Sequence, residues 1–574
     1  MKNAQIAKIF RDIAKLLELK GDNPFRIRAY ERAALNIDSL AEDLEVFLKR
    51  GELTSISGIG KDLALKIEEI IKTGTLSFYE DLKKQIPQGL LTMMEIPGIG
   101  PKTVKYIYEK LHIDDIDKLE EAARKGKLHH LEGIKEKTEE NILKGIALIR
   151  QGRERTPLYF AMQVADKFIS ELKNLKEVEA IEVAGSLRRK KDTVKDIDIL
   201  IISKKPKKVM VYFVRLPQVK EVIAHGETKS SVLEEEHSIQ VDVRVVDKES
   251  FGAALMYFTG SKQFNIKLRQ IAVKKNYKIN EYGVFLQKGK EKRVAGRTEE
   301  EIFSLMGTSF IPAELREDRG EIEAALKNKL PHLVELRDIK GDFHVHSLYS
   351  DGSASLEEIA RAGLKKGYEY IGVADHSQSL KVAGGLEKRR VYEKIEEIRK
   401  INKKYKNIRL LCATEVDILS DGELDYPDSI LKEFDLVIAS VHSGFKQSKR
   451  QLTKRIISAC KNKYVHIIGH PTGRLWGTRE AYDIDLEEIF KAARDYHTAL
   501  EINCYPHRLD LNDINALWAK KKGVKLSIGT DAHILNQLEM MELGLSVARR
   551  GWLEKNDLLN CLNLNALLKW LGKQ

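Results

Sequence analysis

The chain has 574 residues, of which 43% are hydrophobic and 32% are charged, and its formal net charge is +12. This length exceeds what one hydrophobic core supports, so we expect several domains, and the composition excludes a disordered or fibrous protein. Because the sequence has no apolar run of about 18 residues, no secretory apolar core and no Cys-x-x-Cys pair among its four cysteines, we expect a cytoplasmic protein without membrane spans.

The first part of the chain, up to about residue 90, shows the periodicity of short amphipathic helices. Glycine-rich turns at 56–61 and 96–102 precede predicted helices at 63–71 and 103–111. One such turn alone more often caps a helix. Two copies with basic neighbours favour DNA backbone binding, because glycine lets the N–H groups at a helix start meet a phosphate. The glycines concerned are Gly58, Gly60, Gly98 and Gly100.

Two strand-like runs in the middle of the chain carry three carboxylates. Asp196 and Asp198 lie two apart in one predicted strand, so their side chains share a face. Asp242 lies in another predicted strand, from Ile239 to Val246. Such carboxylates can hold paired divalent ions about 3.5–4 Å apart, the usual arrangement for phosphoryl displacement.

The residues just before this carboxylate group supply groups that bind phosphate. An apolar strand-like run, Ala180 to Ala184, leads into Gly185-Ser186-Leu187-Arg188-Arg189. Glycine permits close backbone approach, and arginine pairs with phosphate in a bidentate manner. An Asp-x-Asp pair alone more often belongs to a solvated edge strand. With this segment in front and the third carboxylate behind, phosphoryl transfer is the better interpretation.

A basic region follows the carboxylates. Lysine and arginine far outnumber acids from Phe251 to Arg297, and no acid stands between Lys204 and Lys220. A charge run is usually a solvated face, but these runs flank the carboxylates and therefore favour a nucleic-acid partner. Within the region, Tyr257-Phe258-Thr259-Gly260-Ser261 precedes a predicted helix that contains Asn265 and Arg269.

The last 230 or so residues alternate between strand-like and helical runs, which predicts a barrel with helices outside. The predicted strands are 342–346, 370–374, 409–413, 435–440, 465–469, 499–503 and 525–529. A single histidine at a strand end is more often structural. Nine metal-ligating side chains near the carboxyl ends of these strands instead predict a metal centre. They are His344, His346, Asp351, His376, Glu415, His442, His470, Asp531 and His533.

These motifs resemble two known families. The segment from Gly185 to Arg189, with the carboxylates behind it, is similar to the palm of family X DNA polymerases, the group that includes DNA polymerase beta, and the likeness extends to about residue 320. From about residue 341 the chain resembles a polymerase and histidinol phosphatase (PHP) domain, a combination typical of bacterial family X polymerases.

The resemblance implies a multidomain fold of the α+β and α/β classes. Helical helix-hairpin-helix domains would precede a nucleotidyltransferase palm and a thumb, and a C-terminal (β/α)7 PHP barrel would follow. The implied domains are a lyase-like helical domain (1–90), fingers (91–150), palm (151–247), thumb (248–317), linker (318–340) and PHP phosphoesterase barrel (341–574).

The resemblance also implies roles in the polymerase part. The three carboxylates would bind two Mg²⁺ or Mn²⁺ ions, and Arg269 would touch the template strand. Lys195 departs from the small residue usual before the first aspartate. The implied nucleotide-binding residues are Arg155, Gly185, Ser186 and Arg189 at the triphosphate, Tyr257, Phe258 and Gly260 at the sugar, and Asn265 at the base.

Lys66 stands at the position of the lysine with which polymerase beta removes deoxyribose phosphate. Where that enzyme has another lysine, this chain has Asp62. A lysine on an amphipathic helix is ordinarily solvated, so lyase activity stays a minor hypothesis.

In the barrel the resemblance implies three divalent ions, Zn²⁺ or Mn²⁺. Glu415 would bridge the first two sites, and His507 and Arg508 are candidates for touching a phosphate. The first ion would be held by His344, His346, Glu415 and Asp531, the second by Glu415, His442 and His470, and the third by Asp351, His376 and His533.

Our leading hypothesis is a monomeric DNA polymerase that fills short gaps in DNA repair with deoxynucleoside triphosphates. Its PHP barrel would act as a metal-dependent 3′–5′ exonuclease or phosphoesterase on gapped or primed DNA. One alternative is a phosphoesterase that uses the front half only to grip DNA. The other is a DNA-binding repair scaffold in which the barrel metals are structural.

Overall fold

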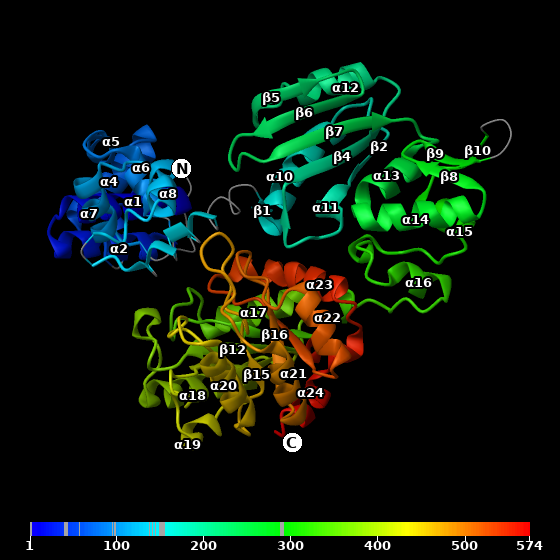
Figure 1. Cartoon of the computed structure of the whole chain (residues 1–574). Coiled ribbons are helices and arrows are strands. Elements are labelled where there is room, and N and C mark those ends of the chain that lie inside the picture. Colours follow the sequence, from blue (N-terminus) through cyan, green and yellow to red (C-terminus); the bar gives the residue numbers. More distant parts are fainter. Residues whose placement is uncertain are drawn as a thin grey trace.

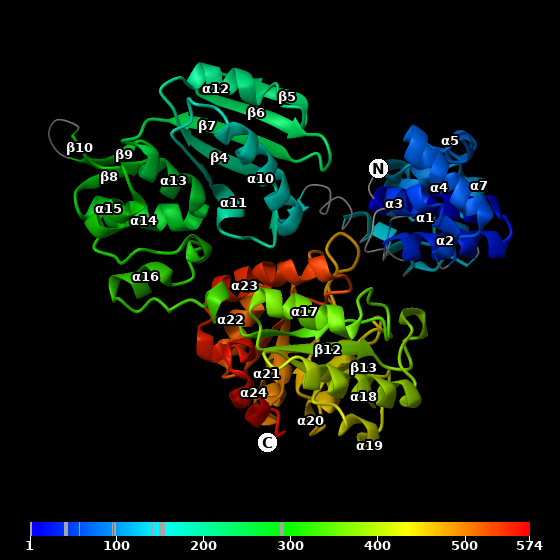
Figure 2. The same ribbon diagram turned by 180° about the vertical axis from the view of Figure 1, so that it is seen from behind.

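The computed structural model describes residues 3–38, 44–56, 58–94, 96, 99–131, 133–136, 138–140, 142–143, 145–147, 155–287 and 292–573. Three parts follow one another along the chain: a helical N-terminal part, a mixed central part and a C-terminal barrel (Figure 1). The same three parts are seen from behind in Figure 2. Within the described residues, every helix is too short or too polar to cross a membrane.

The N-terminal part contains short helices around two separate apolar cores. Ile6, Phe10, Ile13 and Leu17 recur at helical spacing in the first helix and are buried. The helices predicted after the two glycine turns are confirmed as α4 and α7. The elements are α1 (Asn3–Lys20), α2 (Pro24–Asp38), α3 (Leu44–Arg50), η1 (Leu53–Ser55), α4 (Lys61–Thr73), α5 (Ser77–Lys84), α6 (Gln88–Met93), α7 (Pro101–Leu111) and α8 (Ile116–Arg124).

The central part begins with a five-stranded sheet in the order β2-β4-β7-β6-β5. Strands β4 and β7 pair in parallel, and the other neighbours pair antiparallel. The three predicted strands of this region are confirmed as β2, β4 and β7. The strands are β2 (Ala180–Val183), β4 (Asp196–Ile202), β5 (Val219–His225), β6 (Lys229–Glu234) and β7 (Gln240–Val246).

Alternation along β4 separates the apolar core from the carboxylates. Ile197, Ile199 and Ile201 are buried in one core with apolar residues of α10 (Leu158–Lys173) and α12 (Pro206–Phe213). The opposite face of β4 carries the aspartates and is flanked by α11 (Gly185–Arg188) and α13 (Phe251–Thr259). A short antiparallel pair, β1 (Thr156–Pro157) and β3 (Thr193–Val194), precedes β4.

The remainder of the central part surrounds its own apolar core. Ile322 and Ala325 of the predicted linker are buried in this core, and Val334 donates its N–H to the carbonyl of Leu553, 3.0 Å away. The segment is therefore packed against both neighbours. The elements are α13, α14 (Lys262–Lys274), β8 (Tyr277–Asn280), β9 (Gly283–Leu286), β10 (Arg293–Ala295), α15 (Glu299–Leu305), η2 (Ala313–Leu315) and α16 (Glu321–Leu326).

The C-terminal part is a barrel of seven parallel strands in sequential order. A parallel bridge between Val345 and Ala532 brings the first strand next to the last. The seven predicted strands are confirmed, and all are buried along their length except for Arg409. The strands are β11 (Gly341–Val345), β12 (Tyr370–His376), β13 (Arg409–Asp417), β14 (Leu436–Ser440), β15 (Ile467–Ile468), β16 (Ala499–Asn503) and β17 (Leu526–Gly529).

Helices surround the barrel, as strand–helix alternation predicts (Figures 1 and 2). Their inward faces are apolar, so both faces of each strand are covered. The helices are α17 (Leu356–Lys366), α18 (Lys388–Lys404), α19 (Asp428–Leu431), α20 (Lys449–Lys461), α21 (Leu486–Asp495), α22 (Asp513–Lys521), α23 (Met541–Arg550) and α24 (Leu564–Trp570).

Ion pairs join the barrel to the central part. Arg474 Nη1 lies 2.9 Å from Asp192 Oδ2, and Arg549 Nε lies 2.7 Å from Glu314 Oε1. Both views show α22 and α23 at the side of the barrel that faces the central part (Figures 1 and 2). The two parts are thus connected by specific contacts of side chains as well as by the chain itself.

Candidate active sites

The three predicted carboxylates of the central sheet lie together. Asp198 and Asp242 are register partners on the parallel strands β4 and β7, and Asp196 shares the face of Asp198. Gln240 Nε2 donates to Asp242 Oδ1 at 2.8 Å, and Lys229 Nζ lies 3.7 Å from Asp242 Oδ2. The group therefore combines three acids with few cations.

This concentration of acids acts most strongly on Asp198. Burial raises its pKa, the charges of Asp196 and Asp242 raise it further, and it reaches about 7. A divalent ion relieves the same repulsion that protonation relieves. The arrangement thus fits a site for hard cations with oxygen ligands.

Gly185 is required for this geometry. Its φ is +64°, and a Cβ there would lie 2.4 Å from Asp198 Oδ2. Any larger residue would displace the carboxylate. Ser186, the next residue, is half-buried in α11. The glycine turn and the acids are therefore one unit.

The two arginines of this segment contact residues 257–261, which we call the aromatic-glycine string. Arg188 donates from Nη1 to Thr259 Oγ1 at 3.0 Å and binds Glu299 through two hydrogen bonds of 2.8 Å. Arg189 donates to the carbonyl of Thr259 at 2.6 Å and to Glu317 Oε1 at 2.9 Å. The structure thus brings together two of the predicted nucleotide-binding segments.

The remaining predicted nucleotide residues are held by local contacts. Asn265 Nδ2 donates to the carbonyls of Tyr257 at 2.7 Å and Gly260 at 3.2 Å, and the guanidinium of Arg244 lies 4.7 Å from the centre of the Phe258 ring. A nucleotide base would have to replace the contacts of Asn265.

Two further arginines flank these segments. Arg269 is exposed on α14. Arg155 donates to Thr193 through the hydroxyl at 2.9 Å and the carbonyl at 2.7 Å, which places it beside the strand that leads to the aspartates.

The nine predicted ligands of the barrel converge at the carboxyl ends of its strands. Glu415 lies at the centre: its Oε1 is 3.2 Å from His442 Nε2 and 2.9 Å from His470 Nε2. Its Oε2 is 3.5 Å from His344 Nε2 and 3.0 Å from His376 Nδ1. This position is what a bridging ligand requires.

The other two acids hold the rest of the cluster. Asp531 Oδ1 lies 3.2 Å from His346 Nε2 and 3.8 Å from His344 Nε2. Asp351 Oδ2 lies 3.4 Å from His533 Nε2 and 3.6 Å from His376 Nε2. Each group of ligands implied by the resemblance therefore lies together, and the two groups that contain Glu415 share it.

The donor atoms fit divalent metal ions. His344 Nε2, both ring nitrogens of His346 and His376 Nδ1 are buried and form no well-aligned hydrogen bond among the described residues, although each lies 3.0–3.5 Å from a carboxylate of the cluster. Nitrogens and carboxylates that face one another without hydrogen-bond geometry are what a set of metal ligands requires. Three overlapping groups have donor atoms within 4.8 Å of one another: His346, Asp351, His376 and His533; His344, His346 and Asp531; and His376, Glu415 and His442. They do not coincide with the three implied sets, because His346 and His376 each fall in two of them and His470 falls in none.

Charges within the cluster balance one another. Burial would lower the pKa of His344, but Glu501, Glu415 and Asp531 raise it well above its ordinary value. Burial would raise the pKa of Glu415, but the surrounding imidazoles lower it well below its ordinary value. Burial and the neighbouring histidines lower the pKa of His346 to about 4, which leaves a neutral imidazole to act as a ligand.

The sequence alone did not reveal two carboxylates that orient the ligands. Glu501 Oε1 lies 2.7 Å from His344 Nδ1, and its Oε2 accepts from the N–H of His470 at 2.7 Å. Asp417 contacts His442 Nδ1. Such contacts fix the ring and tautomer of a ligating histidine. Each carboxylate could have been suspected from the sequence, because each is an acid in a predicted buried strand. Asp417 lies two residues after Glu415, and Glu501 stands inside an apolar run.

Arg508 lies at the edge of the cluster. Its Nε is 3.8 Å from Asp531 Oδ2, and its Nη1 is buried without a partner among the described residues. His507 instead packs on Phe160 of the central part, with ring centres 5.4 Å apart. Of the two residues suggested for a phosphate contact, Arg508 is placed to make it.

The described glycines of the helix-hairpin-helix turns fall into two kinds. Gly58 has a φ of +77°, and a Cβ there would crowd Asn36 and Arg32. Gly60 and Gly100 open α4 and α7, have no neighbour within 4 Å of a Cβ, and provide no side-chain cap. Helix starts without a side-chain cap suit a phosphate, although α7 offers fewer donors, because Pro101 has no N–H and Thr103 already donates to the carbonyl of Gly100. Gly98 lies outside the described residues.

Lys66, the lyase candidate, lies on α4. Its Nζ is 2.5 Å from Asp62 Oδ1 and 5.7 Å from the centre of the Phe78 ring. A Schiff base needs a neutral amine, so this ion pair would have to break before the lysine could react.

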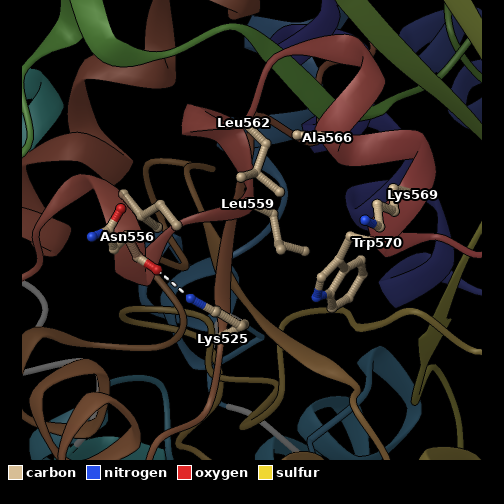
Figure 3. Close-up of a pocket in the computed structure, with 8 residues that line it drawn as sticks. Lys525, Asn556, Leu559, Leu562, Ala566, Lys569 and Trp570 are labelled. Atoms are coloured by element: carbon tan, nitrogen blue, oxygen red, sulfur yellow. Dashed lines mark hydrogen bonds between the residues drawn. The ribbon is translucent and has the colours of Figure 1, made fainter.

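A pocket of about 310 Å³ opens at the other end of the barrel (Figure 3). Lys525 precedes β17, whereas the ligand Asp531 follows it, so the pocket and the ligands lie at opposite strand ends. Lys525 Nζ donates to the carbonyl of Asn556, and the Trp570 ring also lines the pocket (Figure 3). None of the nine ligands lines this pocket.

Four known family models match the chain. A helix-hairpin-helix domain matches residues 1–76, and a SAM-like helix-hairpin-helix tandem matches residues 90–147. The DNA polymerase beta thumb matches residues 254–317, and the PHP domain matches residues 342–504. These matches include both glycine turns, the aromatic-glycine string and seven of the nine barrel ligands.

Curated relatives match either the whole chain or only part of it. DNA polymerase/3′-5′ exonuclease PolX of Bacillus subtilis (strain 168) is 41% identical over 575 residues, which cover 100% of both chains. A probable phosphatase of Thermoanaerobacter sp. (strain X514) is 32% identical over 38% of this chain and 89% of its own length. A probable phosphatase of Caldanaerobacter subterraneus subsp. tengcongensis is 34% identical over 34% of this chain and 76% of its own length.

Proposed function

This chain belongs to the family X DNA polymerases that carry a C-terminal PHP domain, and from that premise we propose that it fills short DNA gaps and removes nucleotides from 3′ ends. The observation that supports the proposal is that two separate groups of side chains of the kind that ligates metals come together, three aspartates on β4 and β7 and a set of histidines and acids at the mouth of the barrel. We further assign both activities to the filling of short gaps during DNA repair.

In the central part, Asp196, Asp198 and Asp242 would hold two Mg²⁺ or Mn²⁺ ions. Bound ions of this kind stabilise charge on the attacking and leaving oxygens of phosphoryl transfer. The protein contributes the placement: Gly185 leaves room for Asp198, and Gln240 orients Asp242. The backbone and these hydrogen bonds thus fix the ligands before DNA arrives.

We assign the triphosphate to Arg155, Ser186 and Arg189 beside Gly185. Tyr257, Phe258 and Gly260 would lie along the sugar. The support is their convergence: Arg189 already contacts the carbonyl of Thr259, inside the aromatic-glycine string. Asn265 would exchange its backbone contacts for the minor-groove edge of the base, and Arg269, which is exposed, would reach the template.

In the barrel, three divalent ions, Zn²⁺ or Mn²⁺, would bind in the groups implied by the resemblance. Metal ions in such sites activate water and polarise the phosphoryl group. The chain itself holds the ligand rings in place through Glu501 and Asp417 and offers Arg508 to the phosphate. The unpartnered Arg508 Nη1 supports that role, because guanidinium suits phosphate oxygens.

The N-terminal part would grip DNA through Gly60, Gly100 and the neighbouring helix starts. It binds the phosphate backbone and leaves sequence selection to the template strand. Lys66 would act as a lyase nucleophile only after its ion pair with Asp62 opens. We assign that activity a secondary place.

A second reading of the barrel is a phosphomonoesterase, favoured by the shorter relatives that are named probable phosphatases. DNA with a 3′-phosphate distinguishes the two. Release of inorganic phosphate without shortening of the strand indicates the phosphatase, and release of nucleotides indicates the exonuclease.

Variants disabled in one half each test the proposal on gapped DNA. Asp198→Ala should abolish primer extension and leave 3′-end degradation intact. His344→Ala with His346→Ala should do the reverse. Asp166→Ala and His497→Ala are matched controls, because both side chains are exposed and lie outside the two sites. Extension by Asp198→Ala within about tenfold of wild type, about 1.4 kcal/mol of barrier, would refute the polymerase site.

A further inference from the structure

We propose that the barrel supplies a positioning residue to the polymerase site: Arg550 holds the palm segment that carries Arg189. The inference rests on the proposed role of Arg189 at the triphosphate. Arg550 ends α23, and the whole residue is only 2% exposed. Its Nη1 donates to the carbonyl of Arg189 at 2.7 Å, across 361 positions of the sequence.

The same guanidinium also fixes the side chain of Arg189. Arg550 Nη1 lies 3.1 Å from Glu317 Oε1, and that oxygen accepts from Arg189 Nε at 2.9 Å. Glu317 is thus shared by one arginine from the palm and one from the barrel. Burial would raise its pKa, but these two cations hold it below the ordinary value, so the carboxylate stays charged. Arg550 therefore acts on Arg189 at both the backbone and the side chain.

Only a guanidinium can make this set of contacts. Arg550 Nη2 donates to Asp513 Oδ2 at 2.6 Å while Nη1 serves Arg189 and Glu317. The acceptors come from the palm, the end of the thumb and the barrel. A lysine supplies charge but not a planar fork, so it can satisfy only part of this geometry.

The surroundings of Arg550 carry an excess of positive charge. Arg319 Nη1 lies 3.0 Å from Asp513 Oδ2, the same oxygen that accepts from Arg550. Lys191 lies close enough to Arg550 and Asp513 for their charges to act on it. Burial lowers the pKa of Lys191 and Arg550 lowers it further, whereas Glu317, Asp513 and Asp192 raise it. Four cations, Arg189, Lys191, Arg319 and Arg550, stand against these three acids. Such an excess beside Arg189 favours a polyanion such as a triphosphate.

A second barrel arginine holds the other end of the same palm segment. Arg474 Nη1 donates to Asp192 Oδ2 at 2.9 Å, and the adjacent Thr193 holds Arg155. Residues 189–192 are therefore fixed by the barrel at both ends. Because Arg474 also donates to the carbonyls of Arg508 and Leu509 near the barrel cluster, it cannot serve as a selective test. Arg550 contacts none of the nine predicted ligands of the barrel, so it can serve as a selective test.

The experiment measures single-nucleotide insertion into gapped DNA by the full-length protein, with KM for the deoxynucleoside triphosphate and kcat determined separately. Arg550→Gln is compared with Arg549→Gln. Arg549 is the matched control, because it pairs with Glu314 across the same interface and has no contact with Arg189. The 3′-end degradation rate and the melting temperature are measured for each variant.

Arg550→Gln should raise KM for the nucleotide about tenfold or more with a smaller change in kcat, since a group misplaced by about 1 Å can cost 10²-fold. Arg549→Gln should stay within twofold, and both should degrade 3′ ends as wild type does. Arg550→Lys should give an intermediate KM, and it replaces Arg550→Gln if that variant does not fold.

Three outcomes overturn the inference. One is an unchanged KM in both Arg550 variants. Another is an equal rise in KM for Arg549→Gln and Arg550→Gln, which would mean that interface stability alone matters. The third is a wild-type protein that adds no nucleotide, which would overturn the proposed function before any variant is compared.

Discussion

The carboxylates of the palm and the ligand cluster of the barrel are both suited to divalent ions, but they reach that state differently. In the palm, burial and the charges of Asp196 and Asp242 raise the pKa of Asp198 to about 7, and the cations Arg244 and Lys229 offset this only in part. In the barrel, imidazoles surround Glu415 and lower its pKa well below the ordinary value. The palm depends on ions and substrate for charge balance, whereas the barrel balances most of its charge itself.

This difference has a functional meaning. We expect ions at the palm carboxylates to arrive with the nucleotide and leave with the product. We expect ions held by the buried histidines of the barrel, which further carboxylates orient, to stay with the protein. Three predictions test whether the two sites differ in this way and a fourth tests DNA binding by the N-terminal part, from the largest expected effect to the smallest.

Glu415→Gln should reduce 3′-end degradation at least 100-fold, about 3 kcal/mol of barrier, because it removes the charge at the centre of the cluster. Primer extension should stay within twofold. The metal content of the purified protein, measured by elemental analysis, should fall as well. Glu423→Gln, an exposed acid of the same barrel, is the control. If the variant keeps its metal content and its rate of 3′-end degradation, Glu415 does not bridge two metal ions.

Glu501→Gln should weaken metal retention or degradation by about 10–100-fold, as loss of an orienting carboxylate does in other metal sites. The His344 ring would lose its ionic partner while all nine ligands remain. Gln240→Leu is the corresponding change in the palm, and we expect less than tenfold there. If Glu501→Gln and Gln240→Leu reduced the activity of their sites equally, the barrel ligands would depend on orienting carboxylates no more than the palm aspartates depend on Gln240.

Asp198→Asn should stabilise the metal-free protein at pH 8. Because the folded pKa of about 7 lies above the ordinary 3.8, ionisation costs stability as pH rises between these values. The neutral amide removes a cost on the order of 2 kcal/mol, shared among three coupled acids. Thermal unfolding in a chelator should show a higher melting temperature than wild type at pH 8 and little difference at pH 4.

Saturating Mg²⁺ should reverse that order, since only the carboxylate binds the ion. Asp166→Asn, which removes an exposed acid, is the control. If the melting temperatures of wild type and Asp198→Asn differ equally at both pH values, repulsion among the palm carboxylates is not the cause.

Gly60→Val with Gly100→Val should weaken binding to gapped DNA roughly threefold to tenfold, about 0.7–1.4 kcal/mol. Both positions have negative φ and open space, so the fold tolerates the side chain while phosphate approach is hindered. Fluorescence anisotropy across a salt series measures the effect. Thr75→Val, at the far end of α4, is the control. If the affinity for gapped DNA is unchanged, these turns do not contact DNA.

Much of the architecture follows from local sequence patterns. Parallel strands place their carboxyl ends at one mouth, so side chains as distant as His344 and Asp531 were expected to meet. Asp196 and Asp198 were expected to share a face because of their spacing. In these cases a short pattern determines where the side chain points.

Contacts that depend on packing between distant segments could not be predicted in this way. Glu501 is one acid in an apolar strand, and nothing in that strand says which histidine it meets. Arg550 and Arg189 are 361 positions apart and meet only because the barrel packs on the palm. The contact of Arg189 with Glu317 likewise requires the relative placement of palm and thumb.

The adjacency of the first and last barrel strands affects how the protein is made. His344 lies in β11 and Asp531 follows β17, so the cluster cannot assemble until the last strand has left the ribosome. At about 5–20 residues per second, translation takes roughly 10–40 s to cover that interval. During this time His344 and His346 belong to an unfinished barrel and can meet any divalent ion in the cell. The complete ligand set can therefore select an ion only after synthesis has passed Asp531, from the divalent ions that the cell then offers.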